Sequence, residues 1–282
     1  MLEKRQTKRL AIIIIYIFIF SLIASLFYWI FRPSPTCHDG KKNQGEEEID
    51  CGGPCKACPV VIKAKDLEIE KQRFINSSPK MYDVAIKIKN PNEQYGAKSF
   101  RYNVKLLDAN NKVLVSRSGY SFILPREEKY LIETNLKIKN DYLPHKMKVT
   151  FENYDWKEFT QYNEKPQLNV YQKRYEKVNS PEVFGAVYGL VKNDSPFDFN
   201  SVIVKVVLKN KAGDILAVNS TQMNTLTAGE ERDFRLIWPR SFPGNVFKIE
   251  VEPEANVYDS LNFTKKYLPH QKFQNYENEN WN

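Results

Sequence analysis

Residues 202–217 read VIVKVVLKNKAGDILA and contain two alternating segments separated by a short polar turn. In the first segment, large apolar residues occupy every second position: Val202, Val204, Val206 and Leu208. Because successive side chains of a strand point to opposite faces, alternation over seven or more residues predicts a half-buried β-strand. Ala212-Gly213 predicts the turn, since glycine tolerates positive φ. The stretch therefore predicts a strand, a turn and a second strand.

A similar pattern occurs about 102 residues earlier, where FRYNVKLLDANNKVLV (100–115) has Asn110-Asn111 as its turn candidate. Three further pairs match in the same order: AIKIKNPN (85–92) with YGLVKNDS (188–195), LPREEKYLIE (124–133) with TAGEERDFRLIW (227–238), and KVTFE (148–152) with KIEVE (248–252). This period is far longer than a solenoid unit, so each copy should bury its own core. We expect tandem domains at 60–156 and 167–253, joined by a linker at 157–166.

Each copy contains about seven short segments of this kind, which is typical of an immunoglobulin-like β-sandwich. The expected fold class is therefore mainly β. Neither copy contains cysteine, so no disulfide joins the two sheets of a domain. Trp156 and Trp238 fall at strand ends, where core packing is expected and carbohydrate stacking is the alternative. Residues 254–282 lose the alternation, and we expect a tail that is mobile or lies on the second domain.

The second copy resembles the FxLYD family of bacterial envelope domains. The resemblance rests on GAVYGLVKNDS (185–195), VIVKVVLKNKAGDILAVNST (202–221) and LTAGEERDFRLIW (226–238). It departs at Lys209-Asn210, where the family has Tyr-Asp, whereas the first copy keeps Leu107-Asp108. The family is described by fold and location, so the resemblance implies an envelope domain and no catalytic residue.

A run of 22 residues without a charge extends from Leu10 to Phe31. As a helix it would span about 33 Å, enough for a hydrocarbon core of about 30 Å. Four basic residues precede it: Lys4, Arg5, Lys8 and Arg9. Because basic flanks stay cytoplasmic, we expect residues 1–9 in the cytoplasm, residues 10–31 across the cytoplasmic membrane, and the rest outside. A cleaved signal peptide is the alternative, although its apolar core would be shorter.

Residues 32–59 contain all four cysteines of the chain, Cys37, Cys51, Cys55 and Cys58. An exterior location permits disulfides, and an even number of cysteines favours them. Four cysteines allow three connectivities, among which the sequence does not choose. A segment this short cannot bury a core, so two bridges would have to hold it.

This segment resembles a small cysteine motif of many bacterial and archaeal exported proteins, C-x-D-G-x-x-N-x-x-E-x-x-x-D-C-G-G-x-C-x-x-C. The matching positions are Cys37, Asp39, Gly40, Asn43, Glu46, Asp50, Cys51, Gly52, Gly53, Cys55 and Cys58. Gln44-Gly45 stand where the family often has Gly-Asp, which removes one acidic group. The motif implies an exported, disulfide-stapled module. The whole layout resembles single-pass envelope proteins of small-genome bacteria.

Two kinds of metal site are conceivable in the cysteine segment. Asp39, Asn43, Glu46 and Asp50 are oxygen donors at short spacings, and calcium takes six to eight such oxygens. Zinc could instead bind three or four of the cysteines together with His38, although the second C-x-x-C pair of a zinc ribbon is missing. The remaining alternative is that the acidic residues form Asx-turns and solvate the surface, with no cofactor.

Composition narrows the function. The mean hydropathy of −0.54 excludes a multi-span membrane protein. Of the net charge of +8, residues 1–9 carry +3 (four basic residues and Glu3), which leaves +5 outside. No basic run is interleaved with aromatic residues, so no nucleic-acid partner is expected. No P-loop, G-x-S-x-G or H-E-x-x-H sequence occurs, so we expect a protein that is not an enzyme.

We therefore expect a membrane-anchored extracytoplasmic protein that presents tandem sandwich domains for protein–protein contact or envelope assembly, with envelope proteins as partners. The alternative is a calcium- or glycan-binding surface module. It is motivated by the acidic loop of residues 39–50 and by aromatic residues such as Tyr95 and Tyr120.

Overall fold

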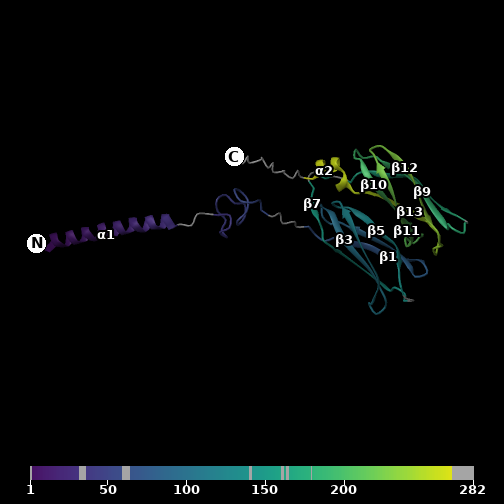
Figure 1. The fold of residues 1–282 in the computed structure, drawn as a ribbon, viewed down its shortest axis with the longest axis horizontal. Helices are drawn as coiled ribbons and strands as arrows, with labels where there is room; N and C mark the ends of the chain where they lie inside the picture. The colour runs from purple at the N-terminus through teal and green to yellow at the C-terminus, as the bar shows by residue number, and fades with distance from the viewer. Residues whose placement is uncertain are drawn as a thin grey trace, which may run out of the picture. The chain divides into compact units, whose positions relative to one another are not determined.

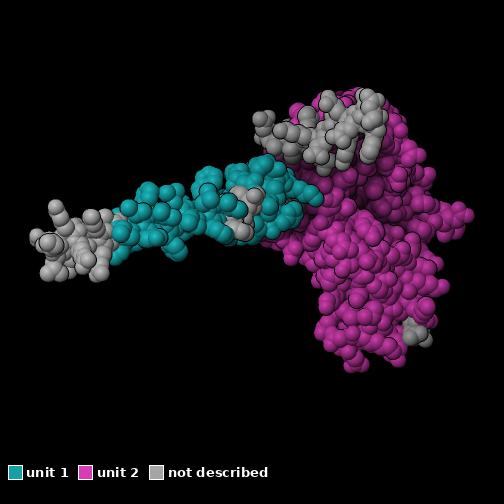
Figure 2. Space-filling view, turned by 60° about the vertical axis from the view of Figure 1, so that its left-hand side comes forward, with its two compact units in different colours: residues 1–62 teal, residues 63–282 magenta. Residues whose placement is uncertain are grey.

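The computed structural model describes residues 2–31, 36–58, 64–139, 142–159, 162, 165–178 and 180–268; in the N-terminal helix it describes the side chains of residues 12–30. The chain forms two compact units, Met1–Ile62 and Lys63–Asn282 (Figure 2). All strands of the described residues lie in the second unit (Figure 1). The predicted fold class is confirmed: the chain is mainly β, with an apolar N-terminal helix and a small disulfide-linked segment.

Helix α1 (Leu2–Phe31) begins before the predicted span at Leu10, because residues 2–9 are mostly good helix formers such as Glu, Lys and Arg. Its stretch Ile12–Ile30 has a mean hydropathy of 2.5, and none of it is buried. The helix is therefore long and apolar enough to cross a membrane. A signal sequence fits the same description.

Two disulfides join the cysteine segment, Cys37–Cys55 and Cys51–Cys58. The bridges overlap in sequence, because Cys51 lies inside the loop that the first bridge closes and Cys58 lies outside it. Only Glu46 and Gly52 are buried among residues 36–58, and Ile49 is 58% exposed. The segment therefore holds no apolar core of its own.

The N-terminal sandwich consists of β1–β7 and has two antiparallel sheets. One sheet has the order β1-β2-β5, with bounds β1 (Glu68–Ser78), β2 (Met81–Lys89) and β5 (Glu128–Lys137). The other has the order β4-β3-β6, with β7 also paired to β3; its bounds are β3 (Tyr95–Leu107), β4 (Val113–Ile123), β6 (Lys146–Glu152) and β7 (Trp156–Glu158). The alternating residues Val84, Ile86, Ile88, Phe100 and Val104 fill the core between the sheets.

The C-terminal sandwich consists of β8–β13 and the short helices that follow them. Its sheets have the orders β8-β9-β12 and β11-β10-β13. Their bounds are β8 (Leu168–Lys177), β9 (Gly185–Asn193), β10 (Phe199–Lys209), β11 (Ile215–Leu226), β12 (Glu231–Trp238) and β13 (Lys248–Ala255). Val202, Val204 and Val206 lie in its core, as their alternation predicts. The two sandwiches share one strand order, with β1–β6 corresponding to β8–β13.

The sandwiches pack face to face through the β1-β2-β5 sheet and the β11-β10-β13 sheet (Figure 1). Ala85 of β2 and Val207 of β10 meet here, on the faces that point away from their own cores. The sequence predicted half-buried strands, whereas the middle of β2 and the part of β10 from Val204 to Leu208 are buried on both faces. Lys205, which alternation placed on the solvent face, is consequently only 6% exposed.

Asn90 and Asn193, each 0% exposed, hold equivalent turns in the two sandwiches. Asn193 Nδ2 donates to the carbonyls of Phe197 (2.7 Å) and Leu226 (3.2 Å), and its Oδ1 accepts the Ser195 N–H (3.1 Å). Asn90 Nδ2 donates in the same way to two carbonyls, at 2.7 and 2.8 Å. A buried amide thus satisfies several backbone groups at once, which explains the Lys-Asn sequence found in both halves.

Replacing Asn193 by alanine should lower the free energy of unfolding by about 2 kcal/mol, because two buried carbonyls and one N–H lose their partner. Urea denaturation followed by circular dichroism measures this loss. Asn224→Ala, at an exposed position of β11, is the control and should change stability by less than about 0.5 kcal/mol. Equal stabilities of the two variants would contradict the assigned role of Asn193.

The folded unit continues beyond the predicted end of the second domain at residue 253. After β13 come a 3₁₀ turn, η1 (Val257–Asp259), and helix α2 (Leu261–Tyr267). Phe263 is 0% exposed, and Tyr258 Oη donates to the carbonyl of Ile123 at 3.1 Å. Gly96 permits this approach, since a Cβ there would lie 2.5 Å from Tyr258 Oη. The predicted tail therefore begins later, and residues 269–282 lie outside the described residues.

The predicted linker also needs correction at its start. β7 includes residues 157 and 158, which pair with β3, and Phe159 is buried in the core of the C-terminal sandwich. Burying the aromatic ring of Phe159 against a neighbouring core has a lower free energy than leaving it exposed to water. Residues 160, 161, 163 and 164 of this linker lie outside the described residues.

Candidate functional site

The junction between the two sandwiches combines an apolar centre, a buried ionic cluster and a cleft. Ala85, Tyr130, Val207, Ile215 and Val218 form the apolar centre, with Ile75 and Ile132 packed against it. These residues come from the outward faces of β2, β5, β10 and β11. Because both sandwiches contribute, every group at this junction depends on their docking.

The ionic cluster places one carboxylate between two lysines. Glu254 of β13 contacts the ammonium groups of Lys129 on β5 and Lys205 on β10. Lys205 Nζ also donates to the backbone carbonyl of Tyr130 at 2.6 Å, and Lys129 Nζ lies 3.9 Å from the centre of the Phe122 ring. All three charged side chains are at least nine-tenths buried. The cluster therefore carries two positive groups and one negative group away from water.

This imbalance lowers the affinity of the lysines for protons. Burial lowers the pKa of Lys129 to about 8. Burial, followed by repulsion from Lys129, lowers the pKa of Lys205 to about 7. Glu254, together with the more exposed Glu252 at 3.6 Å from Lys205 Nζ, does not offset the desolvation of two ammonium groups, so the second proton is held weakly near neutral pH.

We expect the sandwich unit to become more stable as the pH rises from about 7 to about 9.5. An unfolded lysine keeps its proton up to a pKa of about 10.4, so over this range the unfolded state binds more protons than the folded state. Because contact with Glu254 opposes proton loss, we expect the free energy of unfolding to rise by about 1–2 kcal/mol over this pH range. The rise is smaller than full release of one proton would give, which is ~1.4 kcal/mol per pH unit. Urea midpoints measured across this range should rise, and Lys205→Met should flatten the rise. A falling midpoint would contradict the assignment.

Further ion pairs surround the cluster where it meets solvent. Glu252 accepts the backbone N–H of Tyr130 at 3.0 Å, which ties β13 to β5. Glu250 lies between Lys209 and Lys248; although burial alone would raise its pKa, hydrogen bonds from these lysines lower the pKa to about 2. The Glu250 carboxylate therefore stays ionised at any physiological pH.

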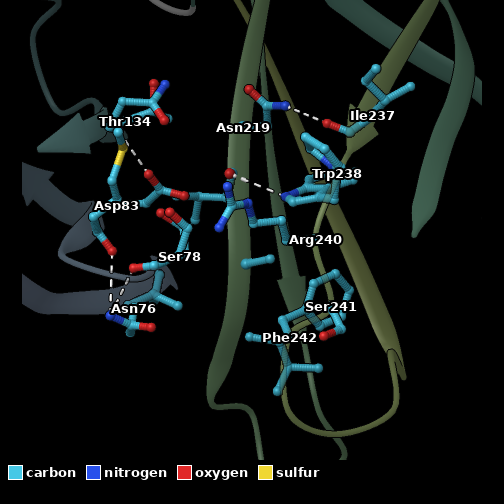
Figure 3. Close-up of a pocket in the computed structure, with 18 residues that line it drawn as sticks. Asn76, Ser78, Asp83, Thr134, Asn219, Ile237, Trp238, Arg240, Ser241 and Phe242 are labelled. Carbon is cyan, nitrogen blue, oxygen red and sulfur yellow. Dashed lines mark hydrogen bonds between the residues drawn. The ribbon is translucent and has the colours of Figure 1, made fainter. Parts of the chain in front are cut away.

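The cleft lies beside the apolar centre and has a volume of about 400 Å³. Its walls come from β1, β2 and β5 on one side, and from β11, β12 and the residues after β12 on the other (Figure 3). Asp83 on β2 is 8% exposed, and its Oδ1 accepts the Asn135 N–H at 2.9 Å. Burial raises the pKa of this carboxyl, which the Asn135 N–H and Ser77 partly oppose. No Lys or Arg among the described residues forms an ion pair with it.

The predicted calcium ligands do lie in one loop; the three carboxylates already accept hydrogen bonds, whereas Asn43 Oδ1 is buried without a partner. Asp39 accepts the Lys41 N–H at 2.9 Å, Glu46 accepts the Asn43 N–H at 3.1 Å, and Asp50 accepts the Gly40 N–H at 3.1 Å. Asn43 Nδ2 donates to Asp39 at 2.9 Å and lowers the pKa of that carboxyl. A calcium ion would have to compete with these hydrogen bonds.

The cysteine sulfurs are likewise committed. Cys37, Cys55 and Glu46 bring metal-ligand atoms within 4.8 Å of one another, but the two sulfurs are bonded to each other. Since zinc binds thiolates, the intact disulfides leave none of the four cysteines for a zinc site with His38.

The tryptophans named for carbohydrate stacking present little free ring face. Trp238 is 6% exposed, and its Nε1 donates to the Val218 carbonyl at 3.3 Å. Trp156 stacks on Tyr154 with ring centres 4.9 Å apart. Of the two tyrosines cited for ligand contact, Tyr120 is 73% exposed and Tyr95 is half-buried.

Sequence reasoning missed Asp83, Lys129, Lys205 and Glu254. All four are charged residues next to apolar ones in strands, which ordinarily face solvent. The sequence contained one indication that these faces are buried, namely the apolar residues Ala85 and Val207 on the same faces.

Comparison with known proteins found no matching family model and no matching curated protein. The solved structures that resemble the chain include two with weak likeness. The transglutaminase of red sea bream is 12% identical, with a TM-score of 0.21 over 68% of this chain and 29% of that protein. The calcium-binding domain CBD12 of CALX1.1 is 14% identical, with a TM-score of 0.18 over 66% of this chain and 80% of that one. The present chain thus spans less than a third of the transglutaminase, and neither likeness carries a functional conclusion.

Proposed function

We propose that this protein is anchored by α1 in the cytoplasmic membrane and presents two copies of an FxLYD-like domain outside it, for non-enzymatic contact with other envelope proteins. The apolar stretch Ile12–Ile30 supports the anchor. The basic residues that precede it support the orientation, because such flanks stay on the cytoplasmic side.

Strand β4 carries the interaction part of the proposal. Within the described residues it pairs only with β3, so its other edge has open backbone groups. It is 11 residues long and contains one charged side chain, Arg117. Val113 is 45% exposed and Tyr120 73% exposed. A long, weakly charged edge strand is a ready surface for a strand from a partner protein.

The edge strand β8 provides a matched comparison. It also has a single paired neighbour, β9, but four of its ten residues are charged: Lys173, Arg174, Glu176 and Lys177. Charges on an edge discourage strand addition. Partner contact is therefore expected at β4 and not at β8.

Photo-crosslinking tests this difference in isolated membranes that contain the full chain. A photoreactive side chain at Tyr120 of β4 should form protein adducts, and the same group at Tyr171 of β8 should form few. Tyr120→Lys should reduce partner capture from cross-linked membranes, and Tyr171→Lys should not. Equal yields at both positions would reject β4 as the contact edge.

Protease protection tests the orientation separately. Protease added to intact spheroplasts should digest the sandwich unit and spare a tag placed at the N-terminus. Protection of the sandwich unit would contradict an outside location.

A further inference from the structure

The cleft between the sandwiches has an anionic end. Asp83 is more than nine-tenths buried and is part of the cleft lining, yet among the described residues it has no cationic partner. Its Oδ1 accepts the Asn135 backbone N–H, and the neighbouring Ser77 hydroxyl also lowers its pKa, but carboxylate lone pairs remain free. Ser77 Oγ, also in the lining, is buried without a hydrogen-bond partner of normal geometry. Buried polar groups ordinarily have partners, so a buried carboxyl without a cation, next to a hydroxyl oxygen that can still accept, points to a missing cationic donor.

The opposite wall has a cationic group. Arg240 follows β12, and its side chain extends into the cleft (Figure 3). Among the described residues it forms no ion pair. Its guanidinium has five N–H donors and stays positively charged, so it suits a carboxylate. The cleft therefore offers an acceptor site and a donor site that do not neutralise each other by direct contact.

Between these two ends the lining contains apolar residues beside polar ones such as Thr134 and Asn219. Trp238, Phe242 and Leu216 come from the C-terminal sandwich, while Ile75 and Met81 come from the N-terminal one. A volume of about 400 Å³ falls in the range of small-molecule sites, which are mostly apolar with a few placed polar groups.

We propose that this cleft binds a small zwitterion of the size of a short peptide, with its ammonium group at Asp83 and Ser77 and its carboxylate at Arg240. An ammonium ion donates the hydrogen bonds that both oxygens lack, and it compensates the buried negative charge of Asp83. An apolar side chain of the ligand lies against Trp238 and Phe242. This goes beyond the contact proposed at β4, because the cleft is a separate site lined by both sandwiches.

Calorimetric titration of the full chain in detergent tests the assignment with three related probes. The dipeptide phenylalanylglycine carries both charges, its N-acetyl derivative lacks the ammonium group, and its C-terminal amide lacks the carboxylate. Binding of the unmodified dipeptide is expected. The acetylated and amidated forms should bind at least tenfold more weakly, because each loses a charge-assisted contact.

Two isosteric variants locate the site. Asp83→Asn, which can still accept the Asn135 N–H, and Arg240→Gln should each weaken binding of the dipeptide at least tenfold. Asp233→Asn and Arg235→Gln, at exposed positions of β12, are the matched controls and should leave binding unchanged. Thermal melting confirms folding; Asp83→Asn should melt no lower than the parent chain, since it removes a buried charge.

Three outcomes would overturn the proposal: no binding of the dipeptide, equal binding of the acetylated dipeptide, or unchanged binding by a folded Asp83→Asn chain. The comparison of the three probes uses only the parent chain, so it tests the proposal even if a substitution impairs folding. Loss of partner capture at β4 would leave these titrations unaffected, which separates the two proposals.

Discussion

Replacing Glu254 by alanine is expected to lower the free energy of unfolding of the sandwich unit by about 3–5 kcal/mol. Glu254 is the shared partner of Lys129 and Lys205, which are 1% and 8% exposed in their side chains. Its removal takes away the carboxylate that contacts both ammonium groups and leaves only the half-buried Glu252, 3.6 Å from Lys205 Nζ, to compensate them. Breaking a buried ion pair is costly for this reason, whereas the intact pair adds little net stability.

Urea denaturation of the full chain in detergent measures this loss, and Glu176→Ala provides the control. Glu176 pairs with Arg174 at 2.8 Å, but both side chains are about half exposed, so its loss should cost less than about 1 kcal/mol. The deficit of Glu254→Ala should shrink above about pH 8, where Lys129 and Lys205 lose protons more easily. A deficit no larger than that of the control would refute a buried ionic cluster.

A triple variant separates the charge from the packing. Lys129→Met, Lys205→Met and Glu254→Leu together replace the cluster by apolar groups of similar size. Such replacements are often neutral or stabilising, so the triple variant should recover most of the stability lost by Glu254→Ala. If it is as unstable as the single variant, packing at the junction rather than unpaired charge explains the loss.

The second large effect is expected on reduction of the disulfides. The described residues of the cysteine segment bury no apolar side chain, so Cys37–Cys55 and Cys51–Cys58 supply the constraint that a core supplies elsewhere. A bridge that closes a loop of about 15 residues stabilises by about 3 kcal/mol. Without both bridges, residues 36–58 should unfold completely.

Limited trypsin digestion with and without reductant measures this effect. Cleavage after Lys41, Lys42 and Lys56 should accelerate by at least tenfold once the bridges are reduced. The sandwich unit contains no cysteine, so its melting temperature should not change and it serves as the internal control. Unchanged protection of these lysines in reductant would show that something other than the bridges holds the segment.

The alternation of Val202, Val204, Val206 and Leu208 was enough to predict a strand and the face that enters the core. It succeeds because strand periodicity depends only on local geometry and on one buried face. The turns at Asn111 and Gly213 followed from the same local logic, and both residues have positive φ, 63° and 84°. Cysteine content and an exported location likewise predicted disulfides, but not their pairing.

The sequence by itself thus determined the strands, the inner face of each sandwich and the apolar helix, because those depend on residues close together in the chain. Only the tertiary structure decided that much of the outer faces of β2 and β10 is buried too. Lys129 and Glu254 meet across 125 residues, and Lys205 and Glu254 across 49. From the sequence alone, a lysine on a strand is predicted to be exposed to solvent. It becomes buried only when another sheet covers it, and the docking of two complete sandwiches determines which sheet does so.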